Sequence, residues 1–132
     1  MINKTMIFLL ASAAVFTACK KTETTLTTTQ KVLGKWTYVG EAGTQTYQGT
    51  TKPTSYTATA GDYADFRTDG KMYSRAQGNY FDTTTYFILN DTLIKIKKDT
   101  ATIKTLTTSS FVFHYKRATP DFSSESTVTL KK

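Results

Sequence analysis

Few side chains in this sequence have the types and spacing that catalysis requires. His114 is the only histidine, and no motif places a serine, threonine or cysteine nucleophile beside a base. Asp62, Asp65 and Asp69 are the closest set of carboxylates, but their spacing fits turn and strand-edge residues better than a glycosidase pair. The sequence has neither the spacing of a metal site nor a glycine-rich phosphate loop. We therefore expect no enzyme activity, no metal and no cofactor.

One residue, Cys19, has surroundings that predict a chemical modification. It is the only cysteine, and it follows an uncharged apolar run, residues 6–16, with Lys4 in front and two small residues behind. This arrangement is typical of a secretory signal peptide. A membrane-spanning helix needs about 20 apolar residues, and the two lysines after Cys19 end the run before that length. We predict that residues 1–18 are a signal peptide and that Cys19 is lipidated as the first residue of the mature protein.

Residues 15–21 resemble the lipobox of Bacteroidetes lipoproteins, in which a residue such as Phe16 can stand where other lipoboxes have leucine. The resemblance implies that Cys19 carries two or three acyl chains, palmitate among them, which hold a protein stably on a bilayer. Lys20 and the lack of an acidic run after the cysteine imply attachment to the outer membrane, facing the periplasm. Two alternatives remain open: an ordinary signal peptide with a chance cysteine, and a short uncleaved anchor.

The charge and composition divide the rest of the chain into a tether and one domain. Lysine and arginine outnumber aspartate and glutamate by 17 to 10, but they are scattered singly or in pairs. We therefore expect a basic surface near anionic lipid and no nucleic-acid partner. Residues 19–30 are rich in threonine and have Leu26 as their only apolar residue after the cysteine, so they predict a flexible tether. Residues 31–132 are predicted to form one domain, without disulfides.

This domain is predicted to be all-β, a small antiparallel up-and-down β-barrel of about eight strands. Threonine, tyrosine, phenylalanine, valine and isoleucine dominate it, and turn residues recur about every eight to twelve positions. Asp69-Gly70 is the clearest hairpin turn, and residues 30–33 could form one helical turn. Eight strands can close into a barrel that is filled by side chains or holds one small ligand. The predicted strands are residues 35–41, 55–60, 63–67, 71–77, 80–89, 92–97, 100–106, 111–117 and 126–130.

Several short segments resemble the lipocalin-like domain of Bacteroidetes lipoproteins. Gly34-Lys35-Trp36 resembles the Gly-x-Trp start of lipocalins, and residues 65–71, 86–96 and 103–113 resemble later parts of the domain. The resemblance implies a barrel that is closed by packing at the Trp36 end. It also implies a basic side chain of the last strand over the tryptophan ring, for which Arg117 and Lys131 are both candidates.

The aromatic residues, 8 Tyr, 8 Phe and one Trp, are the strongest indication of a ligand. One hypothesis is that some of them bind a small apolar or glycan ligand in the barrel. The alternative is a structural or interaction lipoprotein that binds an envelope protein partner and no ligand. Convergence of Trp36, Phe66, Phe87, Phe111 and Phe113 into a solid core would favour this alternative. The candidate ligand-binding residues are Trp36, Tyr63, Tyr73, Tyr86 and Phe113.

Three short motifs suggest a second modification. They are Asp82-Thr83-Thr84, Asp91-Thr92-Leu93 and Asp99-Thr100-Ala101. Each resembles the Asp-Thr-small or Asp-Thr-apolar pattern that Bacteroidetes use for protein O-glycosylation. The resemblance implies glycans on one or more of Thr83, Thr92 and Thr100.

Lipidation can be tested by substituting Cys19 and fractionating cells that express the full chain. Cys19→Ser is expected to move the protein from the membrane fraction to the soluble fraction, because a serine hydroxyl cannot take the diacylglycerol group. Lys20→Ser is the matched control and should leave the protein in the membrane fraction. Tight membrane association of Cys19→Ser would contradict the prediction.

Overall fold

The computed structural model describes residues 24–132, which form a short helix and nine β-strands. The predicted signal peptide, residues 1–18, and Cys19 lie outside the described residues. Each of the nine predicted strands has a counterpart. In chain order the elements are α1 (Thr28–Val32), β1 (Gly34–Tyr47), β2 (Thr50–Thr57), β3 (Tyr63–Phe66), β4 (Lys71–Ala76), β5 (Tyr80–Asn90), β6 (Leu93–Ile96), β7 (Asp99–Leu106), β8 (Ser110–Thr119) and β9 (Phe122–Lys131).

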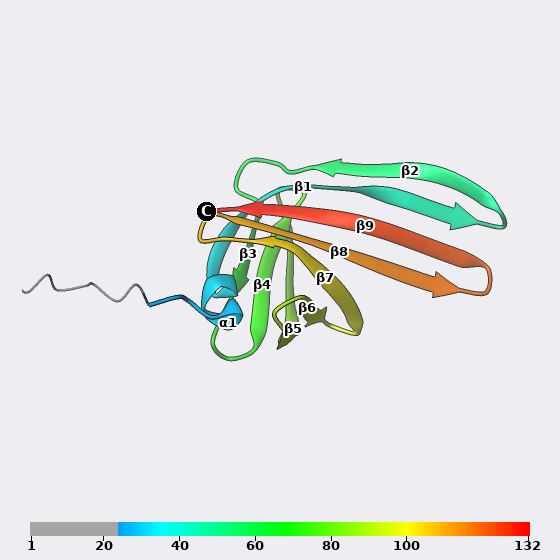
Figure 1. Ribbon diagram of the computed structural model, residues 1–132. Helices are drawn as coiled ribbons and strands as arrows, with labels where there is room; N and C mark the ends of the chain where they lie inside the picture. The colour runs from blue at the N-terminus through cyan, green and yellow to red at the C-terminus, as the bar shows by residue number, and fades with distance from the viewer. Residues whose placement is uncertain (1–23) are drawn as a thin grey trace, which may run out of the picture.

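The strands form one antiparallel sheet that closes into an eight-stranded barrel, with β2 as an additional strand (Figure 1). From β3 to β9 each strand pairs with the next along the chain, and β1 closes the ring by pairing with both β3 and β9. The predicted all-β, antiparallel up-and-down barrel is confirmed. The order differs in one respect: among the described strands, β2 pairs with β1 alone and lies outside the ring.

Strand β1 extends well beyond the barrel because its second half has a partner on each edge. Residues 34–37 pair with β3, and from Gly40 to Tyr47 the strand pairs with β2 on one edge and β9 on the other. The sequence predicted an end at Glu41, which is followed by Ala42 and Gly43, two residue types that are depleted in strands. Hydrogen-bonded ladders on both edges override that local preference.

The extended parts of four strands form a second structural feature, which we call the arm. It comprises residues 40–57 of β1 and β2 and residues 116–126 of β8 and β9, in the order β2-β1-β9-β8, and it projects away from the barrel (Figure 1). A β-carbon at Gly43 would collide with the backbone oxygen of Glu125 on β9. The close approach of β1 and β9 in the arm therefore requires glycine at this position.

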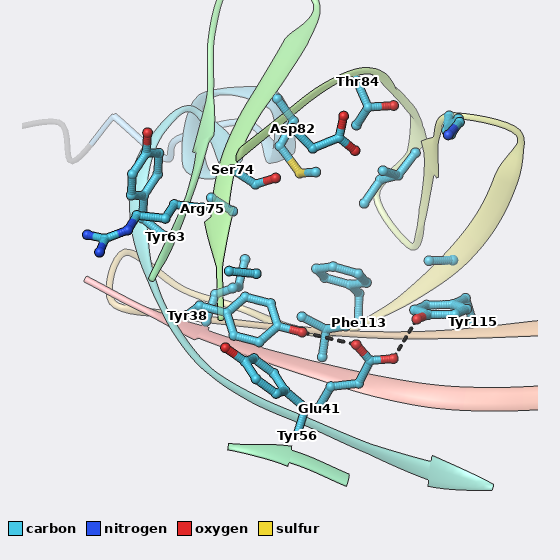
Figure 2. A pocket seen from close by; sticks show the side chains of 18 of the residues that line it. Tyr38, Glu41, Tyr56, Tyr63, Ser74, Arg75, Asp82, Thr84, Phe113 and Tyr115 are labelled. Carbon is cyan, nitrogen blue, oxygen red and sulfur yellow. Dashed lines mark hydrogen bonds between the residues drawn. The ribbon is translucent and has the colours of Figure 1, made fainter. Parts of the chain in front are cut away.

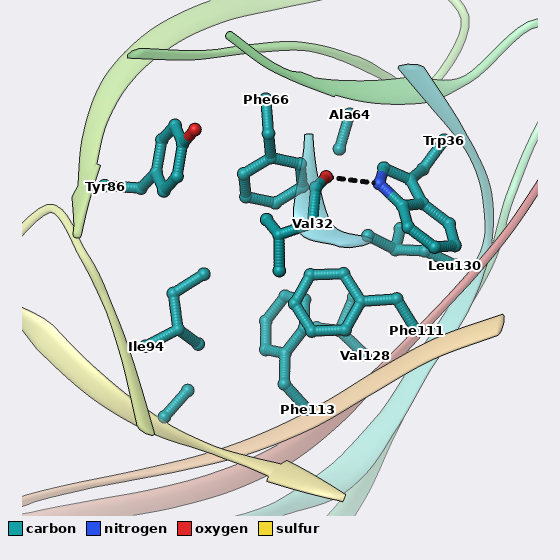
Figure 3. Close-up of a cluster of buried hydrophobic side chains, with 11 residues drawn as sticks. Val32, Trp36, Ala64, Phe66, Tyr86, Ile94, Phe111, Phe113, Val128 and Leu130 are labelled. Carbon is teal, nitrogen blue, oxygen red and sulfur yellow. Dashed lines mark hydrogen bonds between the residues drawn. The ribbon is translucent and has the colours of Figure 1, made fainter. Parts of the chain in front are cut away.

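One end of the barrel is closed by helix α1 and by a cluster of apolar side chains, which we call the base core (Figure 3). The indole Nε1 of Trp36 donates a hydrogen bond of 2.7 Å to the backbone oxygen of Val32, which fixes the helix against the first strand. The Trp36 ring is fully buried. The base core consists of Val32, Trp36, Phe66, Ile94, Phe111 and Leu130.

Helix α1 begins before the predicted domain start at residue 31. Helix α1 starts at Thr28, and Thr27 and Gln30 form a reciprocal capping box at its N-terminus. The Thr28 hydroxyl also donates a 2.5 Å hydrogen bond to the carboxylate of Asp91, beyond the end of β5. Residues 28–30, at the end of the predicted tether, therefore belong to helix α1, and Thr28 contacts the barrel.

The cation over Trp36 is Lys132, so both predicted candidates were wrong. Lys132 Nζ lies 4.2 Å from the centroid of the indole and donates a 2.8 Å hydrogen bond to the backbone oxygen of Leu33. Lys131 is exposed, because strand alternation after the buried Leu130 turns it to the outside. Arg117 lies in the arm and forms an ion pair with Asp99.

Of the five aromatic residues whose convergence would favour a solid core, four do converge. Phe111 packs against Trp36, Phe66 and Phe113, with ring centroids 5.6, 5.8 and 5.1 Å apart. Phe87 does not join them: its side chain is 57 % exposed on the outer face of β5, because the neighbouring Tyr86 takes the inward position. The aromatic side chains therefore fill one end of the barrel only.

The role of Lys132 at the closed end can be tested by denaturant unfolding, followed by the fluorescence of Trp36. Lys132→Ala is expected to lower the free energy of unfolding by about 1 kcal/mol, because it removes a cation–π contact and a hydrogen bond to Leu33. Lys131→Ala is the matched control and should change it by less than about 0.5 kcal/mol. Equal effects of the two substitutions would contradict the assignment.

Candidate functional site

A cavity of about 640 Å³ opens into the barrel on the side of the base core that faces away from α1 (Figure 2). Its position follows from β1, which leaves the helix, buries Trp36 and then presents Tyr38 and Glu41 to the cavity. The side chains next to the base core, which we call the floor of the cavity, are apolar. Polar side chains line the wall farther from the base core. The floor is formed by Ala64, Met72, Ile96, Ala101, Phe113, Val128 and Leu130.

A register shift in β1 places Glu41 in the cavity. Alternation from Trp36 brings Tyr38 inward, and uninterrupted alternation would then bring Gly40 and Ala42 inward. The pairing of β1 with β9 shifts between Tyr38 and Gly40, which is the signature of a β-bulge. After the bulge the inward position falls on Glu41, three residues beyond Tyr38. The one extra residue of the bulge therefore places Glu41, and not Gly40, on the cavity wall.

Three hydroxyl groups donate to the Glu41 carboxylate, and Figure 2 shows those of Tyr38 and Tyr115. The Tyr38 hydroxyl lies 3.0 Å from Oε2, and the Tyr115 hydroxyl lies 2.5 Å from Oε1. The buried Ser126 hydroxyl, on β9, also donates to Oε1. This network links β1, β8 and β9 across the cavity wall and holds the carboxylate in one orientation.

The two tyrosines of the network remain protonated at physiological pH. Burial raises the pKa of Tyr38 far above its ordinary value of about 10, and the negative charge of Glu41 and the hydrogen bond to it act in the same direction. Burial and the hydrogen bond to Glu41 raise the pKa of Tyr115 to about 12. Both phenols therefore act as hydrogen-bond donors to Glu41.

The basic side chains around the cavity are engaged at its rim. Arg117 pairs with Asp99 at the mouth, and its guanidinium lies 5.7 Å from the centroid of the Tyr115 ring. The Arg75 Nε donates to the backbone oxygen of Gly78, and its guanidinium points away from the centre of the cavity (Figure 2). Asp82 and Asp99 also line the cavity, but Asp82 is exposed and Asp99 pairs with Arg117, so Glu41 is the half-buried carboxylate beside the apolar floor.

Asp62 anchors the loop that borders the cavity. It is 1 % exposed and accepts hydrogen bonds from the Tyr56 hydroxyl and from the backbone N–H groups of Thr59, Gln77 and Gly78. Burial alone would raise the pKa of Asp62, but the Tyr56 hydroxyl and the three backbone donors outweigh it, and the pKa is lowered. The carboxylate thereby ties the β2–β3 loop to the β4–β5 turn.

The other two carboxylates of the predicted set serve the turn between β3 and β4. Asp65 forms an ion pair of 2.8 Å with Arg67. Asp69 accepts hydrogen bonds from the Lys71 backbone N–H at 2.9 Å and from the Tyr73 hydroxyl at 3.1 Å. These contacts agree with the prediction of turn and strand-edge roles, and they do not assemble a carboxylate pair with Asp62.

The structure brings two of the five candidate ligand-binding residues to the cavity. Phe113 contributes to the floor, and Tyr63 lies at the rim, with Lys35 Nζ 4.1 Å from its ring centroid. Trp36 is sealed in the base core. Tyr86 is also buried in the core and donates its hydroxyl to the backbone oxygen of Arg67. Tyr73 does not line the cavity, and the Arg67 guanidinium stacks on its ring at 4.2 Å.

Sequence reasoning missed three residues of the cavity wall, namely Tyr38, Glu41 and Tyr115. Alternation could have found two of them, because Tyr38 follows Trp36 by two positions and Tyr115 follows Phe113 by two. The bulge hid Glu41. Tyr56 reaches the site from β2, whose position outside the ring no local pattern indicated.

The remaining predicted sites lie on the surface. His114 is half-buried on β8, with its Nδ1 2.9 Å from the Thr127 hydroxyl, on the face opposite Phe113 as predicted. Thr83, Thr92 and Thr100 are all exposed. Within residues 24–132, no three His, Cys, Asp or Glu side chains are grouped as they would be for holding a metal ion. The same residues contain no helix with the length and hydropathy that crossing a bilayer requires.

The anchoring role of Asp62 predicts a pH-dependent contribution to stability. Since the folded pKa lies below the unfolded value of about 3.9, the contribution is complete at neutral pH and is lost as the pH falls through the folded pKa. Asp62→Asn should therefore lower the free energy of unfolding more at pH 7 than at pH 3, as measured by urea titration. Tyr56→Phe should act in the same direction with a smaller effect. An equal loss at both pH values would contradict this role.

Comparisons with known proteins add no relationship: no family model, no curated protein and no solved structure matches this chain.

Proposed function

We propose that this chain is a lipid-anchored lipoprotein of the cell envelope whose lipocalin-like barrel binds one small, largely apolar ligand. The observation that carries the proposal is the cavity above the base core. Its volume of about 640 Å³ falls within the range of small-molecule sites in proteins. Such sites combine an apolar lining with a few polar groups in fixed positions, and the Glu41 network supplies such groups.

The lining favours an apolar ligand over a glycan. The floor combines aliphatic side chains with Phe113, which offer little to the hydroxyl groups of a sugar. Trp36, whose large aromatic face would suit a stacked sugar, is fully buried in the base core and does not line the cavity. A ligand of this cavity would gain most of its affinity from the removal of apolar surface from water.

The anchor remains part of the proposal on sequence grounds. The apolar run at residues 6–16 and the position of Cys19 support export and acylation, and Lys20 supports the outer membrane. Helix α1, at the closed end, is the element nearest to Cys19 along the chain. A protein attached in this way would display its barrel in the periplasm, within a short tether length of the bilayer.

A second candidate function is that of an interaction lipoprotein with an envelope protein partner. Phe81, Phe87 and Leu89 alternate along the outer face of β5, with exposed fractions of 66, 57 and 51 %. Exposed aromatic and aliphatic groups on one strand are typical of an association surface. The filled base core is compatible with this function, whereas the open cavity favours the first.

Ligand binding can be tested with N-phenyl-1-naphthylamine, a neutral apolar probe whose fluorescence rises on burial. The wild-type protein, residues 20–132, is expected to bind it saturably at a ratio of one to one. Ser74→Phe directs a phenyl group into the cavity and should weaken binding by about tenfold or more, since the ring occupies the space of the probe.

The matched control for this substitution is Thr37→Phe, which places the same ring at an exposed position of β1. It should bind the probe as the wild type does. Equal binding by Ser74→Phe and the wild type would place the probe elsewhere and contradict the cavity. Absence of saturable binding to the wild type would favour the interaction function.

A further inference from the structure

We infer that the ligand carries a protonated amine, which the Glu41 carboxylate and the surrounding phenols recognise while its apolar body occupies the floor. The inference rests on the proposed ligand-binding function and specifies the chemical class of the ligand as an amphiphilic alkyl or aryl amine. It is argued from the charge, the unused hydrogen-bonding capacity and the aromatic surroundings of Glu41.

Glu41 is a half-buried carboxylate that forms no ion pair within the described part of the chain. Its three hydrogen-bond partners, Tyr38, Tyr115 and Ser126, are neutral hydroxyl groups. The ion pairs of residues 24–132 join other residues, so no lysine or arginine nitrogen there lies within 4 Å of Glu41. A partly desolvated charge is stabilised by an opposite charge, which a cationic ligand would supply.

The hydrogen-bonding capacity of the network matches an ammonium group. A carboxylate has about four acceptor positions, and three hydroxyl groups occupy three of them at Glu41. Because Tyr38 and Tyr115 donate their protons to Glu41, their phenol oxygens keep acceptor lone pairs. An alkylammonium has three N–H donors, and the Glu41 network itself leaves three acceptors for them: the fourth Glu41 position and these two phenol oxygens.

The aromatic rings around the Glu41 network also favour a positively charged ligand group. Tyr38 and Tyr56 lie with ring centroids 5.7 Å apart at an interplanar angle of 50°, and Tyr115 and Phe113 also line the cavity. The faces of such rings attract cations through their quadrupoles. Close-up views place Glu41 between Tyr38 and Tyr115, beside Tyr56 and Phe113 (Figure 2).

The basic residues nearby do not reverse this preference for an amine over an acid. Arg117 is matched by Asp99, and Arg75 is directed out of the cavity toward the β4–β5 turn. Lys97 is exposed at the rim. A carboxylate that entered with its alkyl chain on the floor would meet the negative charge of Glu41. A neutral alcohol would gain one hydrogen bond and no ion pair.

The test compares three probes that share one alkyl chain: decylamine, decanol and decanoate. Each is titrated at pH 7 into protein loaded with N-phenyl-1-naphthylamine, and its affinity is read from displacement. Decylamine is expected to bind about tenfold or more tightly than the other two, as an ion pair with a partly buried carboxylate allows. Glu41→Gln should bring decylamine to the affinity of decanol and leave decanol unchanged.

The matched control is Glu125→Gln, which removes a carboxylate that pairs with Lys116 outside the cavity and should preserve the preference for decylamine. Equal displacement by all three probes would overturn the amine inference while the proposed function stands, and so would tighter binding of decanoate. If no probe binds and N-phenyl-1-naphthylamine shows no saturable binding, both the amine inference and the proposed ligand-binding function are overturned. The comparison of the three probes on the wild-type protein tests the amine inference even if Glu41→Gln fails to fold.

Discussion

The shared pairing of β1 is the constraint on which the rest of this structure depends. One strand closes the barrel between β3 and β9 and then continues as the centre of the arm, between β2 and β9. The change of partner occurs around Gly40, where the register of β1 against β9 also shifts. Barrel closure, the position of β2 and the inward orientation of Glu41 all follow from this short stretch of one strand.

The barrel has a filled end and an open end, because its large apolar side chains gather at one end. Trp36, Phe66, Phe111 and Phe113 pack against one another near α1, where the helix and Lys132 complete the seal. Around the cavity, small or polar residues such as Ala64, Ser74 and Glu41 take inward positions alongside Tyr38 and Tyr115. The same eight strands therefore provide stability at one end and empty space at the other.

The sequence permitted the fold to be predicted better than the site. Strong alternation and turn residues such as Asp69-Gly70 located the strands, because these signals are local. The cavity wall depends on features that are not local: the bulge before Glu41 and the placement of Tyr56 by β2. Aromatic content alone could not separate Trp36, which seals the base, from Tyr115, which lines the cavity.

The outer edge of β2 has a consequence for how such molecules behave when crowded together. A free strand edge can template pairing with a second chain and so start aggregation. Here that edge belongs to a strand with Lys52 and Pro53 at its middle, and proline has no N–H with which to extend a ladder. A protein at high local concentration meets its own copies often. The edge of the arm is built to keep those encounters from propagating into fibres.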